Sequence, residues 1–278
     1  MLMASNRERI PKILSAHGIA SRRKAEAMVA EGRVSVNGVV AALGQSADVS
    51  CDVITVDGVT LRAKDAFVYI MLNKPCGYLS TARDERGRKT ILELTRDVGV
   101  RVYPIGRLDK ESEGLILLTN DGDFANRIAH PSGEKVKVYR VEVFGDISMA
   151  YKLLCEPLEI DDYVVSAVNV EIISQKGKTG VISISIAEGR NRQIRKMCAV
   201  CGLKVVSLRR VSIGGLELGT LPLGKWRHLT ESEVEELRGE ESVTICNALN
   251  MKVADGKNRM TTHSSIQQEI LRIMKINP

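Results

Sequence analysis

The apolar run Leu-Ile-Leu-Leu at residues 115–118 constrains the fold of this chain more than any other segment. Turn-forming residues at 120–122 close the run, which is too short for a helix and therefore predicts a buried core strand. The loop ahead of it, residues 106–114, must then be anchored at the edge of the core. In an extended loop Arg107 and Asp109 share a face. Two interpretations of this pair are open, a surface ion pair or a working acid.

The composition fits a globular protein with room for about two domains. The chain has 278 residues, of which 44% are hydrophobic, and both values are ordinary for such a protein. The polar residues 5–9 are followed by no apolar signal core, and no apolar run approaches the ~18 residues of a membrane span. We therefore expect a cytoplasmic protein that does not enter a membrane.

Six scattered cysteines indicate a reducing compartment rather than a disulfide framework. Cys198 and Cys201 have the spacing of a metal-binding pair, but no second pair or nearby histidine accompanies them. With Ile194 and Met197 they form a stripe at helical spacing. We expect buried core thiols and no metal site.

The first sixty residues predict two helices followed by a hairpin. Residues 11–17 begin with proline and are followed by glycine, whereas residues 22–31 begin behind a Ser21 cap. The dipeptide Asn37-Gly38 lies between two valine-rich segments, the strongest short hairpin signal.

Three cations, Arg22, Arg23 and Lys24, occupy the first turn of the second predicted helix. The helix dipole disfavours cations there by about 0.3–1 kcal/mol each, so structure alone does not select them. Free backbone N–H groups joined by cations form a phosphate site; the alternative is a solvated basic face. Residues 7–63 contain the sequence Ile-Ala-Ser-Arg-Arg-Lys-Ala-Glu and, after it, Gly-Arg-Val-Ser-Val-Asn-Gly. On these two motifs the region resembles the S4 RNA-binding domain. The resemblance adds Arg33 to the expected RNA contacts.

A second block begins near residue 67. Residues 67–72 predict an apolar strand leading into Asn-Lys-Pro-Cys-Gly-Tyr at 73–78. A polar loop with four basic residues follows, either solvated or in contact with phosphate: Arg83, Arg86, Arg88 and Lys89. Asp123 is expected to cap a short helix that runs to His130, ahead of a proline.

Two later segments carry polar side chains on predicted elements. Residues 137–143 alternate as a strand, with Tyr139 on the face of Val141 and Val143; taken alone, Tyr139 is a core aromatic with its hydroxyl at the rim. Residues 189–197 predict a helix with three cations on one face, either solvated or turned to a substrate. These are Arg192, Arg195 and Lys196.

These segments together closely resemble ribosomal pseudouridine synthases, in the branch with an N-terminal S4 domain. The resemblance rests on Gly-Arg-Leu-Asp with Ser-Glu-Gly-Leu and Leu-Thr-Asn-Asp-Gly at 106–122, on Lys-x-Tyr-x-Val at 137–141, and on the arginine-containing segment 189–197; it extends over about residues 7–239. It implies that Asp109 is the catalytic aspartate and that Arg195 pairs with it. It also implies that Tyr139 stacks on the target base, that Arg107 enters the gap left by the everted base, and that Leu208 closes the pocket.

The reaction that the resemblance implies breaks the bond from ribose C1′ to uracil N1 and joins C1′ to C5, without net redox change and without a cofactor. An ionised carboxylate must lie near the sugar, either to attack C1′ or to remove the C2′ proton. The arginine partner favours the ionised form of Asp109. The target base must be everted from its stack at a cost of a few kcal/mol.

The rest of the chain predicts the closing part of a sheet and a final helix. Three segments predict strands: residues 205–211, 214–219 and 224–229. Residues 231–238 predict a helix with Thr230 and Glu233 as its capping box. Residues 240–278 depart from the family pattern, and a helix capped by Ser265 there predicts either a docked helix or a flexible tail.

The expected fold class is α+β. A small S4 domain (7–63) precedes a pseudouridine synthase domain (67–239) with a bent, mostly antiparallel sheet flanked by helices, and an extension (240–278) follows. The expected function is site-specific pseudouridine formation in bacterial 23S rRNA by a monomer without cofactor or metal. The partner is ribosomal RNA or an assembling ribosomal subunit. Alternatives are a 16S rRNA enzyme of the same branch and a noncatalytic RNA-binding or ribosome-assembly factor.

Overall fold

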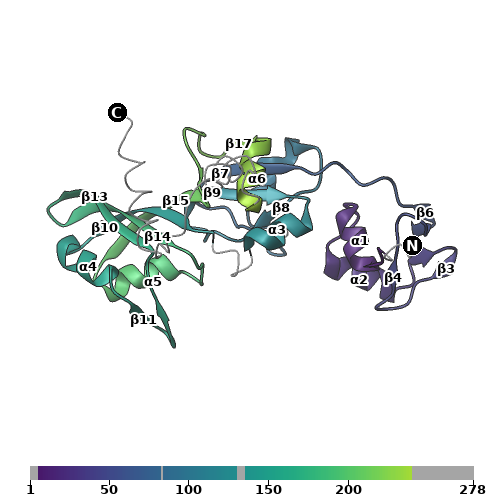
Figure 1. Cartoon of the computed structure of the whole chain (residues 1–278), viewed down its shortest axis with the longest axis horizontal. Helices are drawn as coiled ribbons and strands as arrows, with labels where there is room; N and C mark the ends of the chain where they lie inside the picture. Colours follow the sequence, from purple (N-terminus) through teal and green to yellow (C-terminus); the bar gives the residue numbers. More distant parts are fainter. Residues whose placement is uncertain (1–5, 83, 130–134, 240–278) are drawn as a thin grey trace, which may run out of the picture. The chain divides into compact units, whose positions relative to one another are not determined.

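The computed structural model describes residues 6–82, 84–129 and 135–239 (Figure 1). Three sequence predictions lie outside these residues: the RNA contact of Arg83, the end of the helix expected to reach His130, and the helix capped by Ser265. The described residues contain a hydrophobic core built from residues 10–61 and two further cores built from residues after 67.

The N-terminal region contains two helices and a small antiparallel sheet. The helices are α1 (Ile10–Ala16) and α2 (Arg22–Ala30), and the Ser21 hydroxyl accepts a hydrogen bond from the backbone N–H of Lys24, as a cap should. The strands are β1 (Glu8–Arg9), β2 (Val34–Val36), β3 (Val39–Val40), β4 (Ser46–Ala47), β5 (Ile54–Val56) and β6 (Val59–Thr60). Asn37 and Gly38 have φ of 52° and 79°, the left-handed pair of a type I′ turn. The predicted helix pair and hairpin are confirmed.

Within the described residues after 67, nine strands form one sheet in the order β13-β14-β10-β15-β9-β7-β17, with β16 beside β15 and β8 beside β9. Every pairing is antiparallel except that of β9 and β15. The strands are β7 (Tyr69–Lys74), β8 (Tyr103–Ile105), β9 (Glu113–Thr119), β10 (Lys137–Phe144), β13 (Asn169–Lys176), β14 (Thr179–Ile186), β15 (Lys204–Ile213), β16 (Leu216–Glu217) and β17 (Trp226–His228). The predicted mostly antiparallel sheet is confirmed.

Helices and a small hairpin accompany the sheet. They are η1 (Ile91–Val98), α3 (Gly122–Ala129), α4 (Ile147–Leu154), α5 (Gln193–Val200) and α6 (Glu231–Arg238), with the hairpin of β11 (Leu158–Ile160) and β12 (Tyr163–Val165). In α6 the Thr230–Glu233 capping box forms in both directions, as predicted.

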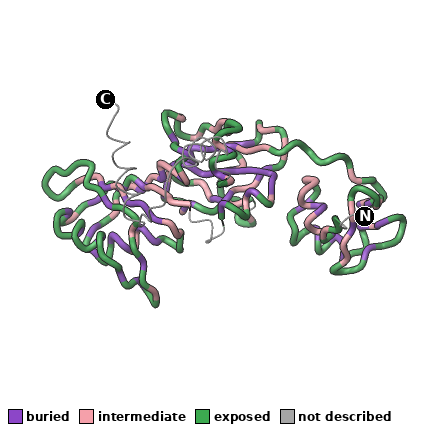
Figure 2. The backbone as a smooth tube through the Cα atoms, in the orientation of Figure 1, coloured by how far each residue is buried: buried purple, intermediate pink, exposed green. Residues whose placement is uncertain are grey.

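Both faces of the central strands are buried, which explains why their sequences are apolar without alternation (Figure 2). Ile116 and Leu118 belong to the core that contains α4 and α5, whereas Leu115 and Leu117 belong to the core that contains α3 and α6. Complete burial of each such side chain stabilises the fold by about 1.5–3 kcal/mol. The predicted core strand at 115–118 is confirmed.

The predicted cap of α3 is wrong. The helix begins at Gly122, so Asp123 already lies inside its first turn and cannot precede it as a cap. Asp121 takes that place, and its Oδ1 accepts hydrogen bonds from the backbone N–H groups of Asp123 and Phe124, at 3.0 and 3.1 Å.

Candidate active site

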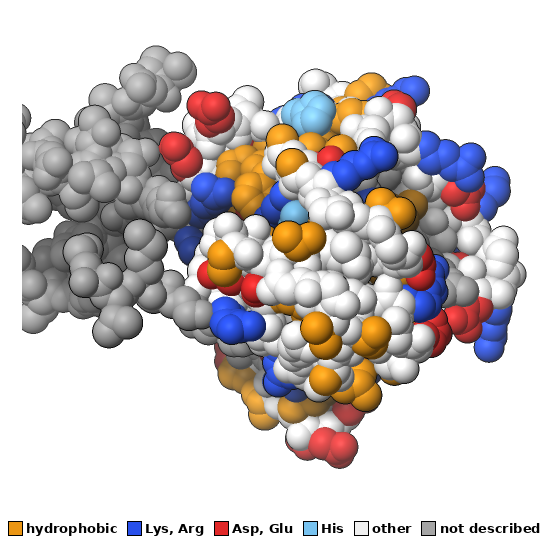
Figure 3. Space-filling model, turned by 90° about the vertical axis from the view of Figure 1, so that its right-hand side faces the viewer, with side chains coloured by type: hydrophobic (Ala, Val, Ile, Leu, Met, Phe, Trp, Pro, Cys, Tyr) orange, Lys and Arg blue, Asp and Glu red, His pale blue; other side chains and the backbone are white. Residues whose placement is uncertain are grey.

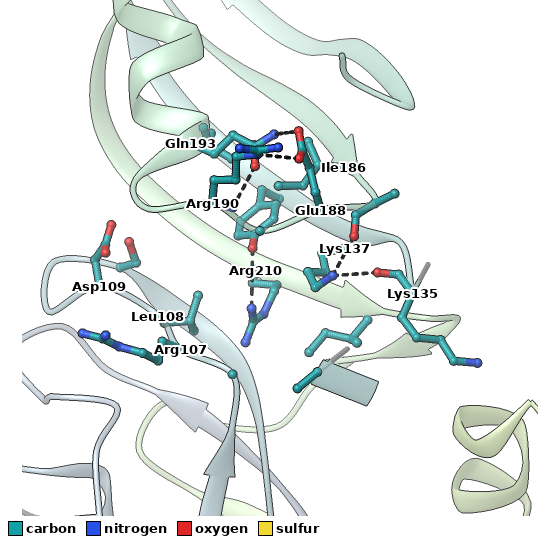
Figure 4. A pocket seen from close by; sticks show the side chains of 18 of the residues that line it. Arg107, Leu108, Asp109, Lys135, Lys137, Ile186, Glu188, Arg190, Gln193 and Arg210 are labelled. Carbon is teal, nitrogen blue, oxygen red and sulfur yellow. Dashed lines mark hydrogen bonds and ion pairs between the residues drawn. The ribbon is translucent and has the colours of Figure 1, made fainter. Parts of the chain in front are cut away.

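A cavity of about 430 Å³ opens where the loop before β9, strands β10 and β15, and the start of α5 meet (Figure 4). Its volume suits a ligand the size of one nucleotide base with its sugar. Five residues singled out in the sequence line it together: Arg107, Asp109, Tyr139, Arg192 and Leu208.

Asp109 faces two guanidinium groups from α5 and its cap. Its Oδ2 lies 3.6 Å from Arg192 Nη1 and 3.9 Å from Arg195 Nε. The Arg195 side chain is 15% exposed, against 45% for Arg192. Water therefore screens the Arg195 charge less, and at nearly equal distance Arg195 is the stronger electrostatic partner. Among the described residues no ion pair joins Asp109 to Arg107, so the surface-pair interpretation of Arg107 and Asp109 has no support in the structure.

Lys74, the last residue of β7, anchors the loop that carries Asp109. Lys74 is fully buried, and its Nζ donates hydrogen bonds to the backbone oxygens of Pro75 (3.1 Å), Asp109 (3.0 Å) and Ser112 (2.6 Å). Burial lowers the pKa of Lys74 to about 8. A second anchor is Ser80, whose hydroxyl bonds both the N–H and the carbonyl of Leu108.

Sequence reasoning missed Lys74 as a site residue. The available signal was a lysine ending an apolar strand directly before a proline, a position where a buried ammonium needs several oxygen partners.

The parallel pairing of β9 and β15 requires Gly114. Its φ is +102°, and a Cβ there would collide with the backbone oxygen of Arg210. The absence of a side chain lets the two strands meet beside the Asp109 loop, which brings residues of β9 and β15 to one cavity.

The three cations predicted to share a helical face diverge in the structure. The helix begins at Gln193, and Arg192 is its N-cap with a left-handed φ of 54°, so the prediction that Arg192 lies on the helix is wrong. A left-handed conformation is unfavourable for arginine and is often found at functional sites. Arg195 Nη2 donates to the carbonyl of Glu111 (3.1 Å) and to the Ser112 hydroxyl (3.4 Å), whereas Lys196 Nζ pairs with Asp161 at 2.6 Å.

Tyr139 and Arg210 lie directly opposite each other on β10 and β15. Tyr139 is 7% exposed and shares its face with buried Val141 and Val143, as predicted. Arg210 is 4% exposed; its Nε donates to the Leu115 carbonyl at 2.8 Å, and its Nη1 lies 3.5 Å from the Tyr139 hydroxyl. Sequence reasoning missed Arg210, although period-two alternation places it on the face of Leu208.

The predicted RNA-contact cations differ in their surroundings. Arg33 bonds Asp57 at 2.9 and 2.6 Å, and Arg88 bonds Asp84 at 3.1 and 2.6 Å. The Arg88 guanidinium holds the pKa of Asp84 at about 2. Two further predicted RNA contacts also pair with carboxylates: Arg192 with Asp109 and Glu111, and Lys196 with Asp161. The remaining candidates in described positions are exposed and, in that part of the chain, without a carboxylate within 4 Å: Arg22, Arg23, Lys24, Arg86 and Lys89.

Total charge does not single out an RNA-binding face. The net charge is +6, and on the face that Figure 3 presents, Lys and Arg side chains are interspersed with acidic and hydrophobic ones. The positions of individual cations, rather than their number, must carry any assignment.

The described part of the chain contains neither a candidate metal site nor a candidate membrane span. No group of three or more His, Cys, Asp or Glu residues there could hold a metal ion. None of its helices is long and apolar enough to cross a membrane. Cys198 and Cys201 are buried in the core, as predicted, and burial raises the pKa of Cys198 to about 12.

Comparisons with known proteins agree with this architecture. The family model described as RNA pseudouridylate synthase matches residues 68–200, and that of the S4 domain matches residues 8–50. An uncharacterized RNA pseudouridine synthase of Aquifex aeolicus is 43% identical over 232 residues, which cover 82% of this chain and 93% of that protein.

Two further relatives extend the comparison. The ribosomal large subunit pseudouridine synthase B of Bacillus subtilis is 40% identical over 238 residues, 83% of this chain and 96% of that protein. A crystal structure of a pseudouridylate synthase superposes with a TM-score of 0.58 at 28% identity, covering 82% of this chain and 99% of that one. The chain therefore belongs to the S4-domain-containing branch of the RNA pseudouridine synthases.

Proposed function

We propose that this enzyme converts one specific uridine of 23S ribosomal RNA to pseudouridine, with Asp109 as the catalytic carboxylate. The observation that carries the proposal is the position of Asp109: its carboxylate lines the base-sized cavity and lies within 4 Å of two guanidinium groups. The relative from Bacillus subtilis, which is named for the large subunit, supports 23S over 16S RNA.

Asp109 is suited to act on the sugar of an everted nucleotide. Cleavage of the C1′–N1 bond gives the ribose oxocarbenium character, which a nearby carboxylate stabilises. Asp109 then either attacks C1′ or removes the C2′ proton. The base turns, and C5 bonds to C1′ while the Asp109–C1′ bond breaks or, in the second case, the C2′ proton returns. The C5 proton is then released and N1 takes up one proton, so that atoms and electrons balance without a cofactor.

Three cavity residues would hold the base and the RNA around it. Tyr139 and Leu208 come from adjacent strands and line the cavity with apolar surface, which supports stacking of the uracil between them. Arg107 is exposed at the cavity rim, a position from which it could enter the gap left in the RNA stack.

The division of labour that we propose assigns residues 7–63 to RNA binding and residues 67–239 to catalysis, with 240–278 as an extension. Separate hydrophobic cores on the two sides of residues 62–66 support the first boundary. The RNA partner is ribosomal RNA, free or in an assembling subunit, with Arg22, Arg23 and Lys24 as phosphate contacts.

The test is tritium release from unmodified 23S and 16S rRNA fragments that carry uridine labelled at C5. We expect the natural chain to release tritium from one 23S fragment and Asp109→Asn to release none above background. Asp162→Asn, an exposed carboxylate in the turn between β11 and β12, is the matched control and should remain active.

Three results would contradict the proposal in different places. Release that survives in Asp109→Asn removes the catalytic role of Asp109. Release from the 16S fragment alone transfers the function to the small subunit. No release from any rRNA, with RNA binding intact, leaves a noncatalytic RNA-binding protein.

A further inference from the structure

Arg210 carries a buried positive charge that no carboxylate balances. Its side chain lines the cavity and is 4% exposed. Nε and Nη1 have partners in Leu115 and Tyr139, but Nη2 is buried with no hydrogen-bond partner among the described residues. In the same part of the chain, no carboxylate lies within 4 Å of this guanidinium.

Among the described residues the neighbourhood of Arg210 offers a cation–π contact with the Tyr139 ring, whose centroid lies 6.0 Å from the guanidinium carbon, but no unpaired carboxylate. Lys137 lines the same cavity, and its Nζ donates to the carbonyls of Lys135 and Ala187 at 2.9 Å each, without a carboxylate partner among the described residues. Glu188 also lines the cavity, but its two oxygens already bond Arg190 and Gln193. Figure 4 shows Arg210 between the Asp109 loop and the two lysines.

An unpaired buried donor on a cation is rare in a folded protein, because the lost hydration is not replaced. Arg195 Nε and Arg209 Nε are also buried without a hydrogen-bond partner among the described residues, but Arg210 is the one of these three arginines whose side chain lines the cavity. A ligand in the cavity can supply the acceptor that Nη2 lacks. The ligand here must bring oxygen acceptors and accept negative charge, since two cations already occupy this part of the cavity.

The strand register places Arg210 beside Tyr139 and Leu208, the two residues that we propose to stack on the base. Arg210 is paired with Tyr139 across β10 and β15, and Leu208 is the next residue on the same face of β15. The Arg210 guanidinium carbon lies 6.0 Å from the centroid of the Tyr139 ring, close enough to reach the edge of a flat ring held between Tyr139 and Leu208. The polar atoms of uracil are all on its edge.

We infer that Arg210 donates a hydrogen bond from Nη2 to a carbonyl oxygen of the everted uracil and stabilises the negative charge that the base acquires during catalysis. This inference rests on the proposed function. When the C1′–N1 bond breaks, its electron pair leaves with the base and is shared among N1, O2 and O4. This pair forms the C5–C1′ bond, loss of the C5 proton then leaves a second pair on the base, and uptake of a proton at N1 ends the anionic stage.

The experiment compares single-turnover rates of base rearrangement for the natural chain, Arg210→Gln and Arg210→Lys on RNA with uridine or 5-fluorouridine at the target position. Because 5-fluorouridine has no C5 hydrogen to release, the readout for both substrates is the loss of the original nucleoside after nuclease digestion. Glutamine can keep a bond to the Leu115 carbonyl but carries no charge. We expect Arg210→Gln to react about 100-fold more slowly on uridine, as for removal of one donor to a developing anion, while RNA affinity changes less than about threefold. Fluorine makes the base a better leaving anion, so the deficit should shrink at least tenfold on 5-fluorouridine. Arg210→Lys should recover part of the rate on uridine.

Arg209→Gln is the matched control, because Arg209 is the neighbouring arginine of β15 but lines a separate depression with Arg140 and Glu217. Its rates should follow the natural chain, and thermal unfolding of all variants reports on folding. An equal deficit of Arg210→Gln on both substrates, or an equal loss of RNA affinity and rate, overturns the inference while the proposed function stands. A natural chain that converts neither substrate overturns the proposed function and this inference with it.

Discussion

Two helices of this protein begin with clustered cations, and the structure uses the two clusters differently. At the start of α2, Arg22, Arg23 and Lys24 are exposed and, in the described chain, have no carboxylate within 4 Å. At the start of α5, Arg192 and Arg195 lie beside Asp109. The first cluster is open to an anion from outside, whereas the second already holds an anion of the protein itself.

A basic helix start therefore has no single meaning in a sequence. A helix N-terminus favours a negative partner. At α5 the chain supplies that partner through the loop before β9, and at α2 we propose that the partner is RNA phosphate. Substitutions in the α5 cluster should therefore change turnover, and those in the α2 cluster should change RNA affinity.

The largest effect is expected at α5. Arg195→Met removes the less exposed cation beside Asp109 and the bonds from Nη2 to Glu111 and Ser112. We predict a fall in the single-turnover rate of about 100-fold to 1000-fold, with RNA affinity reduced less than about threefold. The exposed Arg140 of β10 provides the control Arg140→Met, for which neither quantity should change. If rate and affinity fall together in Arg195→Met, Arg195 is a phosphate contact and the contrast between the two helix starts is lost.

Lys74 offers a second test of the α5 site, because it holds the loop that faces α5. Burial lowers its pKa to about 8 from the ordinary 10.5. Below pH 8 both the folded and the unfolded chain carry the charge, and the folded state bears the full cost of burying it. Between pH 8 and 10.5 only the unfolded chain binds the proton, so this contribution to the free energy of unfolding rises with pH.

We therefore predict that the difference in the free energy of unfolding between the natural chain and Lys74→Met increases by about 3 kcal/mol from pH 7 to pH 10.5. Urea unfolding followed by the fluorescence of Trp226 measures it, since this is the single tryptophan and β17 pairs with β7. A difference that stays constant over this range would show that Lys74 keeps its proton throughout.

Much of the fold could be predicted from the residues alone. The apolar run at 115–118, the Asn37-Gly38 turn and the Thr230 capping box each appear in the structure where the sequence indicated. In each case the determining interactions are local or follow a simple period. The position of the α3 cap was missed by two residues, because Asp121 and Asp123 are both favourable capping residues and leave the first helical residue ambiguous.

The candidate site was predictable only in part. Asp109 was singled out through a family resemblance, and its closeness to Arg195 in the structure agrees with that interpretation. Lys74 and Arg210 could not be assigned, because their meaning depends on which carbonyls and which cavity surround them after the sheet has formed. Likewise, nothing local shows that Arg33 pairs with Asp57, 24 residues away, whereas Asp84, four residues before Arg88, was available in the sequence as a partner.

The smallest expected effect is a change in the salt dependence of RNA binding when the α2 cluster is altered. If Arg22 and Arg23 each contact one phosphate, the double variant Arg22→Ala/Arg23→Ala should lower the slope of log affinity against log salt by about 1.5. With a slope difference of about 1.5, a fourfold rise in salt concentration changes the ratio of the two affinities, natural chain to variant, by about eightfold. The affinity lost by the variant should therefore shrink about eightfold between 50 and 200 mM salt, as measured by filter binding to its rRNA fragment.

Arg33→Ala is the matched control, because Arg33 belongs to the same region but bonds Asp57 through two nitrogens. A guanidinium that is already neutralised displaces few counterions from RNA, so its loss should leave the salt slope unchanged and the affinity within about twofold. An equal fall in slope for Arg33→Ala would mean that RNA displaces Asp57, and that a carboxylate partner in the free protein does not remove a cation from the RNA-binding surface. The remaining difference between α2 and α5 would then be that the carboxylate beside α5, Asp109, takes part in the reaction.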